Sequence, residues 1–320
     1  MIHFADAEVA IEYQIPLTAK RVDFIITGLD EEKKNNAVII ELKQWETASL
    51  SSKSAVVSTR FQYGVSEVAH PSYQAWSYAE MLYHYNEYVR DNDIKLSPCV
   101  FLHNYQQDNV ITNSHYQEYI NKAPVFLKND ALKLRDFISK HIKYSSKDGI
   151  VWMFENGRLK PSKQLADSLC SMLKGNKEFI LLDDQKVVFE TALHMAHKAQ
   201  DGKKQVLIVE GGPGTGKSVV AINLLVELTN MGIAAQYVSK NSAPREVYTT
   251  KLTGNFKKTY IDNLFVGSGC FINAPQNTFG ALIVDEAHRL NEKTGQYNAG
   301  DNQIKEIINA SYFSVFFIDN

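Results

Sequence analysis

The sequence predicts an α/β protein with two domains, in which a mixed sheet is followed by a doubly wound parallel sheet. The length of 320 residues exceeds the roughly 150 residues of an average domain. The N-terminal half holds short strand segments followed by helices, whereas strands and helices alternate regularly from Asp183 onward. Such alternation is typical of a parallel sheet. We place the boundary near Lys160, which gives domains at residues 1–160 and 161–320.

The composition indicates a globular protein without a strong preference for one class of partner. Apolar residues make up 44% of the chain and charged residues 22%, which excludes collagen-like and wholly disordered chains. The formal net charge is -2, so no overall basic field indicates a nucleic-acid partner, although a local basic patch stays open. We expect a cytoplasmic protein without a membrane partner, because no apolar run reaches the roughly 18 residues of a membrane helix. The three cysteines, Cys99, Cys170 and Cys270, are expected to be reduced and buried.

Hydrophobic periodicity predicts the elements of the N-terminal half. β-Branched segments mark strands, and a polar loop at 29–36 makes the second and third strands antiparallel neighbours. The expected elements are strands at 9–15, 21–26 and 37–43, a Ser-rich mobile loop at 48–58, a helix at 72–90, a strand at 98–102 and a helix at 130–144.

The C-terminal half follows a connecting helix at 161–173. Its strands are short and apolar, and its helices have a periodic apolar face. The expected elements are helices at 184–200, 218–231, 243–252 and 302–310, and strands at 205–210, 234–239, 281–285 and 314–319.

A glycine-rich loop follows the expected buried strand at 205–210 and fits the pattern Gly-x-x-x-x-Gly-Lys-Ser. Its backbone N–H groups can converge on phosphate oxygens, and the following helix adds the positive end of its dipole. We expect Lys217 to contact the β- and γ-phosphates of ATP, and the Ser218 hydroxyl to bind Mg²⁺. The residues expected to bind the nucleotide are Gly211, Gly212, Pro213, Gly214, Thr215, Gly216, Lys217 and Ser218.

Two adjacent acids end the apolar strand at 281–285. They lie at the carboxyl edge of the expected sheet, where open α/β sheets bind ligands. We expect Asp285 to hold Mg²⁺ through water, and Glu286 to orient and activate the attacking water. In the alternative interpretation, these acids only cap the strand.

These motifs make the chain from about Phe179 onward resemble the first RecA-like domain of superfamily 1 helicases, in particular the Schlafen-group-3-like DNA/RNA helicase domain family. Asp285-Glu-Ala-His288 resembles the DEAH box of helicases. The resemblance implies that Gln185, in Leu182-Asp-Asp-Gln185, reads the adenine base.

The same resemblance implies a nucleic-acid contact after the strand at 234–239. The segment 239–245 resembles a loop that touches the strand backbone, which would make Lys240 and Arg245 contact residues. Further basic and aromatic side chains follow up to Lys258, and such a mixture suits phosphate contact and base stacking. The alternative is an ordinary solvated helix face.

The end of the chain resembles the start of a coupling motif, at residues 316–319. Helicases of this type complete their ATP site with an arginine from a second RecA-like domain. We therefore expect this chain to be a fragment of a longer protein, or a truncated gene product, that works with a second RecA-like domain or a partner supplying that arginine.

Two acids and a lysine share one face of the expected N-terminal sheet. Asp23 lies in the second strand, and Glu41 and Lys43 occupy alternate positions of the third, so they project to the same side. The carboxylates can hold one or two divalent cations, Mg²⁺ or Mn²⁺, and Lys43 can stabilise a pentacovalent phosphate or position the water. A buried Asp-Glu-Lys cluster costs free energy unless it has a task.

This pattern resembles the PD-(D/E)xK nuclease core, which implies a restriction-endonuclease-like fold. Gln74 and Tyr78 resemble the Gln-x-x-x-Tyr element of the RecB branch and are the implied nucleic-acid contacts. The family usually opens with a helix that bears an acid, whereas only residues 1–7 precede the first strand here. Glu8 or Glu12 would have to take that place.

His70, beside Pro71, has two open interpretations. It is either a phosphate or metal contact, or a helix-capping or core histidine.

The sequence as a whole predicts an ATP-dependent nucleic-acid enzyme, in which a helicase-type ATPase is coupled to a metal-dependent nuclease-like domain acting on DNA or RNA. Such a pairing suggests repair, mobile-element control or defence. The expected catalytic residues are Lys217, Glu286, Asp23, Glu41 and Lys43. Two alternatives remain: a nucleotide-dependent switch that controls a partner interaction, and an ATP-gated binding module with an inactive nuclease half.

Overall fold

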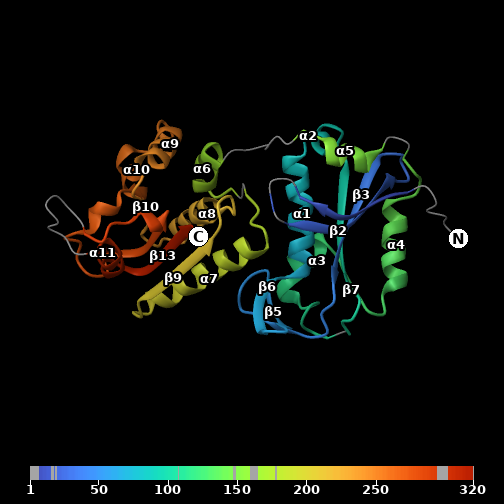
Figure 1. Cartoon of the computed structure of the whole chain (residues 1–320), viewed down its shortest axis with the longest axis horizontal. Coiled ribbons are helices and arrows are strands. Elements are labelled where there is room, and N and C mark those ends of the chain that lie inside the picture. The colour runs from blue at the N-terminus through green and yellow to red at the C-terminus, as the bar shows by residue number, and fades with distance from the viewer. Residues whose placement is uncertain are drawn as a thin grey trace. The chain divides into compact units, whose positions relative to one another are not determined.

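Two groups of strands form separate sheets in the computed structural model, and each sheet is the centre of its own unit (Figure 1). The first unit comprises residues 1–162 and 180–187, and the second comprises residues 163–179 and 188–320. The structure describes residues 7–15, 18, 20–106, 108–146, 149–158, 165–176, 179–293 and 302–319.

The first unit contains a five-stranded sheet in the order β1-β2-β3-β7-β8. The first three strands are antiparallel neighbours, whereas β3, β7 and β8 run parallel, which confirms the predicted mixed sheet. Its strands are β1 Glu8–Gln14, β2 Arg21–Leu29, β3 Asn35–Lys43, β7 Lys95–Leu102 and β8 Val125–Leu127. The helices of this unit are α1 Pro71–Tyr85, α2 Glu87–Asp91, α3 Gln117–Lys122, α4 Ala131–His141 and α5 Ile150–Asn156, with a 3-10 turn η1 at Ser114–Tyr116.

The central strand β3 is buried on both faces, because α1 and α4 cover opposite sides of the sheet (Figure 1). Ile39 packs in one cluster with Leu82 of α1, whereas Val38 packs in another with Phe137 of α4. Alternate residues of a strand face the same side, and Ile25 of β2 lies opposite Ile39. Odd-numbered side chains of both strands therefore face α1.

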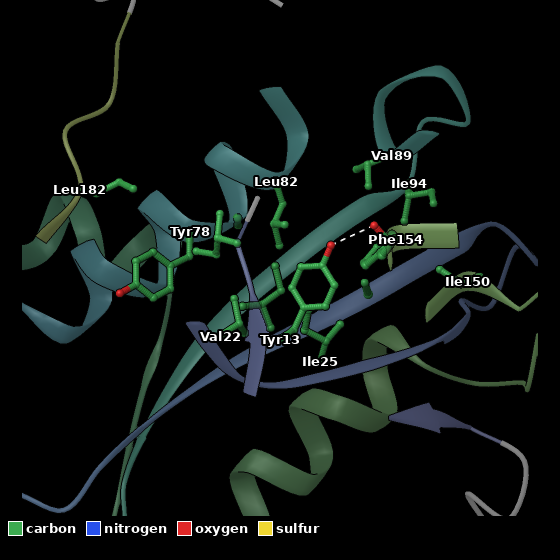
Figure 2. Packing of buried hydrophobic residues seen from close by; sticks show 14 residues of the cluster. Tyr13, Val22, Ile25, Tyr78, Leu82, Val89, Ile94, Ile150, Phe154 and Leu182 are labelled. Atoms are coloured by element: carbon green, nitrogen blue, oxygen red, sulfur yellow. Dashed lines mark hydrogen bonds between the residues drawn. The ribbon is translucent and has the colours of Figure 1, made fainter. Parts of the chain in front are cut away.

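The cluster beneath α1 also joins β1 to α5, as Figure 2 shows. The Tyr13 hydroxyl donates a hydrogen bond of 2.9 Å to the carbonyl oxygen of Phe154. Burial raises the pKa of Tyr13 to about 12, so the hydroxyl keeps its proton and remains a donor at neutral pH. Leu182 packs in the same cluster, which places the start of helix α7 in this unit.

The Ser-rich segment at 48–58 contains strands, so the prediction of a loop there was wrong. Strands β4 (Ala48–Leu50), β5 (Val56–Phe61) and β6 (Gly64–Ala69) form a separate antiparallel sheet. Two adjacent valines at the start of β5 are buried. Pairing with neighbouring strands and this burial outweigh the low strand preference of the serines.

The long helix expected at 72–90 is interrupted at Asn86. This residue adopts an extended conformation with φ of -95° and ψ of 110°. Its Oδ1 accepts hydrogen bonds from the N–H groups of Tyr88 and Val89, and its Nδ2 donates to the Phe154 carbonyl oxygen at 3.0 Å. Asparagine side chains compete with the helix for backbone groups in this way, so α1 ends and α2 begins here.

The second unit contains an all-parallel five-stranded sheet in the order β11-β10-β12-β13-β9, consistent with a RecA-like domain. Its strands are β9 Gln205–Gly211, β10 Ala235–Ser239, β11 Phe265–Val266, β12 Phe279–Asp285 and β13 Ser311–Asp319. Its helices are α6 Leu165–Leu173, α7 Asp183–Gln200, α8 Lys217–Asn230, α9 Ser242–Leu252, α10 Lys258–Leu264 and α11 Gln303–Ala310, with 3-10 turns η2 Ser268–Phe271 and η3 Ala287–Arg289. Residues 161–164 of the expected connecting helix lie outside the described residues, and α7 begins in the first unit and continues in the second.

Strand β12 is buried on both faces, as β3 is in the first unit. Leu282 and Val284 pack in a cluster with Ile307 of α11. The opposite face, which carries Ile283 and Asp285, lies against α8. Alternation along β12 thus directs its terminal acid toward the helix that follows the glycine-rich loop.

The sequence predicted a buried strand at 205–210, but strand β9 is partly exposed. Ile208 is 58% exposed, and the burial alternates along the strand. The described strands pair with β9 on one side only, through β13. An edge strand that is half exposed has an alternating burial pattern even where its sequence is apolar.

The cysteines differ from the prediction in part. All three are free thiols, but only Cys99 is buried, whereas Cys170 is partly buried and Cys270 is exposed. Cys270 lies on the 3-10 turn η2 rather than on a core strand, which explains its exposure. Across the described residues, no helix is both long and apolar enough to cross a membrane.

His70 is a buried helix cap, which decides between its two interpretations. Its Nδ1 accepts a hydrogen bond from the Ser72 N–H at 3.2 Å, and its Nε2 lies 3.0 Å from the Ile111 carbonyl oxygen. The ring stacks on Tyr116 with centroids 4.3 Å apart. A neutral imidazole with its proton on Nε2 satisfies both partners, and burial lowers the pKa of His70 to about 4.

We predict that His70 makes the first unit less stable, relative to a His70→Asn variant, as the pH falls from 7 to 5; the comparison is needed because Glu41 of the same unit has the opposite pH dependence. The unfolded chain protonates His70 below its ordinary pKa of 6.5, whereas the folded chain keeps it neutral to about 4, so protons favour unfolding in this window. The expected loss is about 2 kcal/mol in the free energy of unfolding at pH 5. Urea titrations at both pH values measure it. His70→Asn keeps a capping side chain without the titration, and an equally steep pH dependence in this variant would contradict the prediction.

Candidate functional site

The glycine-rich loop joins the end of β9 to the N-terminus of α8, and its backbone path requires glycine. Gly214 and Gly216 have positive φ values of 75° and 85°, which residues with a Cβ rarely adopt. A Cβ at Gly211 would lie 3.0 Å from the Thr215 Oγ1. These glycines let the chain turn tightly from β9 into the N-terminus of α8, where an anion can bind.

The Lys217 ammonium group curls back over this loop. Its Nζ lies 2.7 Å from the carbonyl oxygens of both Gly211 and Gly212, and 2.6 Å from Oδ1 of Asp319. Asp319 reaches it because the parallel register of β13 and β9 places this residue opposite Gly211. The hydrogen bond from Lys217 lowers the pKa of the Asp319 carboxyl group. A phosphate group at the loop would compete with Asp319 for the ammonium group.

The two residues expected to bind Mg²⁺ are hydrogen-bonded to each other. The Ser218 hydroxyl donates to Oδ2 of Asp285 at 2.7 Å, although the two residues belong to α8 and β12. The Glu286 N–H donates to the other carboxylate oxygen at 3.0 Å. Asp285 is only 5% exposed, so its carboxylate is held rigidly beside the first turn of α8. A hydroxyl and a carboxylate oxygen are hard ligands that suit Mg²⁺.

Tyr237 is a further member of this site that the sequence did not indicate. Its hydroxyl donates to Oδ2 of Asp285 at 2.6 Å. Burial, followed by the charge of Asp285, raises the pKa of Tyr237, so the hydroxyl stays protonated. Tyr237 lies opposite Ile283 in the parallel pairing of β10 and β12. The sequence signal was an apolar strand with one aromatic residue, which is also the signal of an ordinary core position.

Glu286 adopts a left-handed conformation with φ of 51° directly after β12. Its Oε2 lies 3.3 Å from Nε of Arg289, which holds the side chain at the end of the strand. A non-glycine residue in this conformation is uncommon and is often found at functional sites. The geometry turns Glu286 away from the direction of the strand, immediately beside the Ser218–Asp285 pair.

Residues 204–320 match a family model described as Schlafen group 3, DNA/RNA helicase domain. This segment is similar to that helicase domain. The match includes the loop at 211–218, Asp285 and Glu286, and it indicates a nucleic-acid-related ATPase. No curated protein matches the chain.

The basic residues of the helicase domain have different surroundings. Lys240 donates to the Asn291 side-chain oxygen at 2.7 Å and lies on the surface after β10. The Arg245 guanidinium group lies over Gly267. Tyr248, one of the aromatic residues before Lys258 that the sequence suggested for base stacking, is buried and stacks on Phe265 with centroids 5.3 Å apart. It is therefore a core residue, and the contact of Lys240 and Arg245 with nucleic acid stays a prediction.

Gln185 lies in the first turn of α7, before the matched segment. Its Oε1 accepts a hydrogen bond from the Leu182 N–H at 3.0 Å. This turn belongs to the first unit, whereas the phosphate loop belongs to the helicase domain. The role of Gln185 in adenine binding stays a prediction.

Asp23, Glu41 and Lys43 lie at the carboxyl end of β3 and beside it, outside the matched segment. The Leu42 N–H donates to Oδ2 of Asp23 at 2.7 Å, and the Lys43 ammonium group contacts Oε1 of Glu41 at 2.7 Å. Glu41 is 3% exposed. Burial raises the pKa of Glu41 to about 7, against the opposing charge of Lys43. The register of β2 and β3 places these side chains on the α1 face of the sheet, and their catalytic role stays a prediction.

Gln74 and Tyr78 of α1 extend this group through hydrogen bonds. The Gln74 side-chain amide donates to the Tyr78 hydroxyl at 2.9 Å, and that hydroxyl donates to Oδ2 of Asp183 at 2.5 Å. The Lys20 ammonium group lies 3.2 Å from the same Asp183 oxygen. Both residues expected to contact nucleic acid thus bond within the protein here, and that contact stays a prediction. Asp183 was missed because the sequence places it at the start of the following helix.

The two acids expected to stand in for the acid of the family's opening helix bond to other groups of the protein. Oε2 of Glu8 accepts from the Val151 N–H at 3.0 Å, and Glu12 forms an exposed ion pair with Arg21 at 3.0 Å. Within the described ranges, no group of three or more His, Cys, Asp and Glu side chains is arranged to hold a metal ion. A divalent ion at this group would rest on one or two carboxylates with bound water, which is the coordination that Mg²⁺ commonly has.

We predict that Tyr237→Phe raises the Mg²⁺ concentration needed for half-maximal ATP hydrolysis by about tenfold, the equivalent of one hydrogen bond to a charged group. Asp285 would lose a donor that keeps its carboxylate facing Ser218. Steady-state ATP hydrolysis at varied Mg²⁺ measures the change. Tyr248→Phe is the matched control, because its ring lies beside Tyr237 with centroids 5.9 Å apart. Equal shifts in both variants would show that packing, rather than the Asp285 bond, is responsible.

Proposed function

We propose that this chain is an ATP-dependent nucleic-acid enzyme, in which a helicase-type ATPase is coupled to a metal-dependent nuclease-like domain. The substrate class is DNA or RNA, and the pairing of domains suits repair, mobile-element control or defence. The ATPase half is carried by one observation, the convergence of Lys217, Ser218 and Asp285 at the phosphate loop of a matched helicase domain.

In the ATPase half, the residues of the loop bind and orient the substrate. Lys217 exchanges Asp319 for the phosphate oxygens of ATP, and the backbone N–H groups of the loop surround them. Ser218 and Asp285 would hold Mg²⁺. The bound ion would neutralise part of the negative charge of the phosphates. Glu286 orients the attacking water and accepts its proton. An arginine from a second RecA-like domain or a partner completes the site.

In the nuclease-like half, the proposal is supported by strand order and by the end of β3. Three antiparallel strands are followed by the small sheet β4–β6, then by helix α1 and, after α2, by β7, which returns parallel to β3. Asp23 and Glu41 provide carboxylates for Mg²⁺ or Mn²⁺, and Lys43 stabilises the negative charge that develops on the phosphate. Glu41 retains a buried oxygen atom, Oε2, without a hydrogen-bond partner among the described residues, which fits a carboxylate prepared to bind a cation.

A second candidate is an ATP-gated binding module with an inactive nuclease half. The observation in its favour is that Asp23 and Glu41 are each engaged within the protein, by the Leu42 N–H and by Lys43. In this case the first unit holds nucleic acid or a protein without cutting it.

Cleavage and ATP hydrolysis by single variants separate the two candidates. With Mg²⁺ or Mn²⁺, we expect the wild type to cut single- or double-stranded DNA or RNA, and Lys43→Ala to cut about 100-fold more slowly through loss of charge stabilisation. Lys34→Ala, which removes an exposed lysine of the β2–β3 turn, is the matched control. ATP hydrolysis should be unchanged in both variants.

Lys217→Ala tests the other half. We expect ATP hydrolysis to fall by about 100-fold, because Lys217 contacts the transferred phosphate. Any effect of ATP on cleavage should disappear with it. A wild type that binds ATP and nucleic acid but cuts neither DNA nor RNA would favour the binding module.

A further inference from the structure

Two buried carboxylates of the first unit each keep one oxygen atom without a partner among the described residues. Glu41 is 3% exposed and its Oε2 forms no hydrogen bond, and Asp183 is 9% exposed and its Oδ1 forms none. Burying an ionised oxygen in this way is unfavourable unless a proton or a cation compensates. The pair therefore needs a proton or a cation to offset its burial.

The remaining oxygens of these carboxylates are firmly bonded. Oε1 of Glu41 contacts Lys43 at 2.7 Å. Oδ2 of Asp183 accepts from the Tyr78 hydroxyl at 2.5 Å and contacts Lys20 at 3.2 Å. One oxygen of each acid thus fixes the side chain, and the other oxygen stays available.

Tyr78 links the two carboxylates, because its hydroxyl bonds to Asp183 and its helix α1 packs on β3, the strand of Glu41. The charge of Asp183 acts on Glu41, and the Tyr78 hydroxyl interacts with the charges of both acids. Three separate elements contribute to this group of side chains. Tyr78 belongs to α1, Glu41 to β3 and Asp183 to the start of α7.

The formal charge of the surroundings favours a divalent cation. Four carboxylates and two ammonium groups gather here, which leaves a formal charge of about two negative units when all are ionised. These groups belong to Asp23, Glu41, Asp183, Asp184, Lys20 and Lys43.

We propose that Glu41 and Asp183 form a divalent-cation site, with Oε2 of Glu41 and Oδ1 of Asp183 as ligands and water molecules completing the shell. A small hard ion held by two carboxylates and water is typical of Mg²⁺ or Mn²⁺. The site deepens the proposed nuclease-like function, on which it rests, because it adds Asp183 to the group at Asp23, Glu41 and Lys43. This ligand comes from a helix that continues into the second unit.

The test is Mn²⁺ binding to the full chain without nucleotide, measured by the electron paramagnetic resonance of free Mn²⁺. Asp183→Asn keeps the shape and an acceptor for Tyr78, and we expect it to raise the Kd for Mn²⁺ at least about tenfold. Asp184→Asn is the matched control, because this neighbour contacts the same Lys20 but is exposed. Its Kd should change less than about twofold. Mn²⁺ bound at Ser218 and Asp285 would be unaffected in both variants.

A second variant distinguishes the loss of a metal ligand from misfolding. Glu41→Gln should weaken Mn²⁺ binding as Asp183→Asn does, and both should lose the rise in Tm that Mn²⁺ causes in the wild type. A circular dichroism spectrum without metal checks that each variant is folded, because each substitution also removes the charged partner of a lysine.

Three results would overturn the cation site: no Mn²⁺ binding by the wild type, unchanged binding in Asp183→Asn and Glu41→Gln, or equal weakening in Asp184→Asn. A proton shared by the two acids would then explain their burial. The cleavage assay is independent of this outcome. If the wild type cleaves nucleic acid and Asp183→Asn binds Mn²⁺ as tightly as the wild type, the cation site is refuted and the nuclease function stands. If Mn²⁺ binding depends on Asp183 but the wild type does not cleave, the cation site stands and the nuclease function is refuted.

Discussion

Both candidate sites depend on one constraint, the burial of a central strand on both faces. Strands β3 and β12 each lie between covering layers, so a charged side chain within them would have to be buried without water. Their acids, Glu41 and Asp285, lie near the carboxyl ends of the strands, where they are still buried and bond to polar side chains. Alternation along the strand then decides which layer each acid faces. In the first unit that layer is α1, and in the second it is α8.

The two buried acids are stabilised in different ways. Asp285 accepts hydrogen bonds from Ser218, Tyr237 and the Glu286 N–H, so its carboxylate is held in place before any ligand binds. Glu41 has one bonded oxygen, on Lys43, and one without a described partner. Burial of the Glu41 carboxyl group raises its pKa to about 7. The first arrangement is prepared to hold an ion in a fixed geometry, whereas the second requires a proton or a cation to offset its burial.

The phosphate loop itself is held by contacts that a substrate has to replace. Lys217 is bonded to loop carbonyl oxygens and to Asp319 at the end of β13. Since parallel register places Asp319 opposite Gly211, the ends of two neighbouring strands meet at the ammonium group. A phosphate group would compete with Asp319 for the ammonium group, which ties nucleotide binding to the end of β13.

The sequence alone determined the elements with strong periodicity, the parallel sheet and the phosphate loop, because the groups that form that loop are contiguous and local spacing defines them. It also paired Glu41 with Lys43 through the two-residue period of a strand. Only the tertiary structure brought Tyr237 to Asp285, which is 48 positions away, and Tyr78 to Asp183, which is 105 positions away. These bonds depend on strand order and helix placement. No local pattern marks them, because a buried tyrosine that bonds to an acid has the same apolar neighbours in the sequence as one that only fills the core.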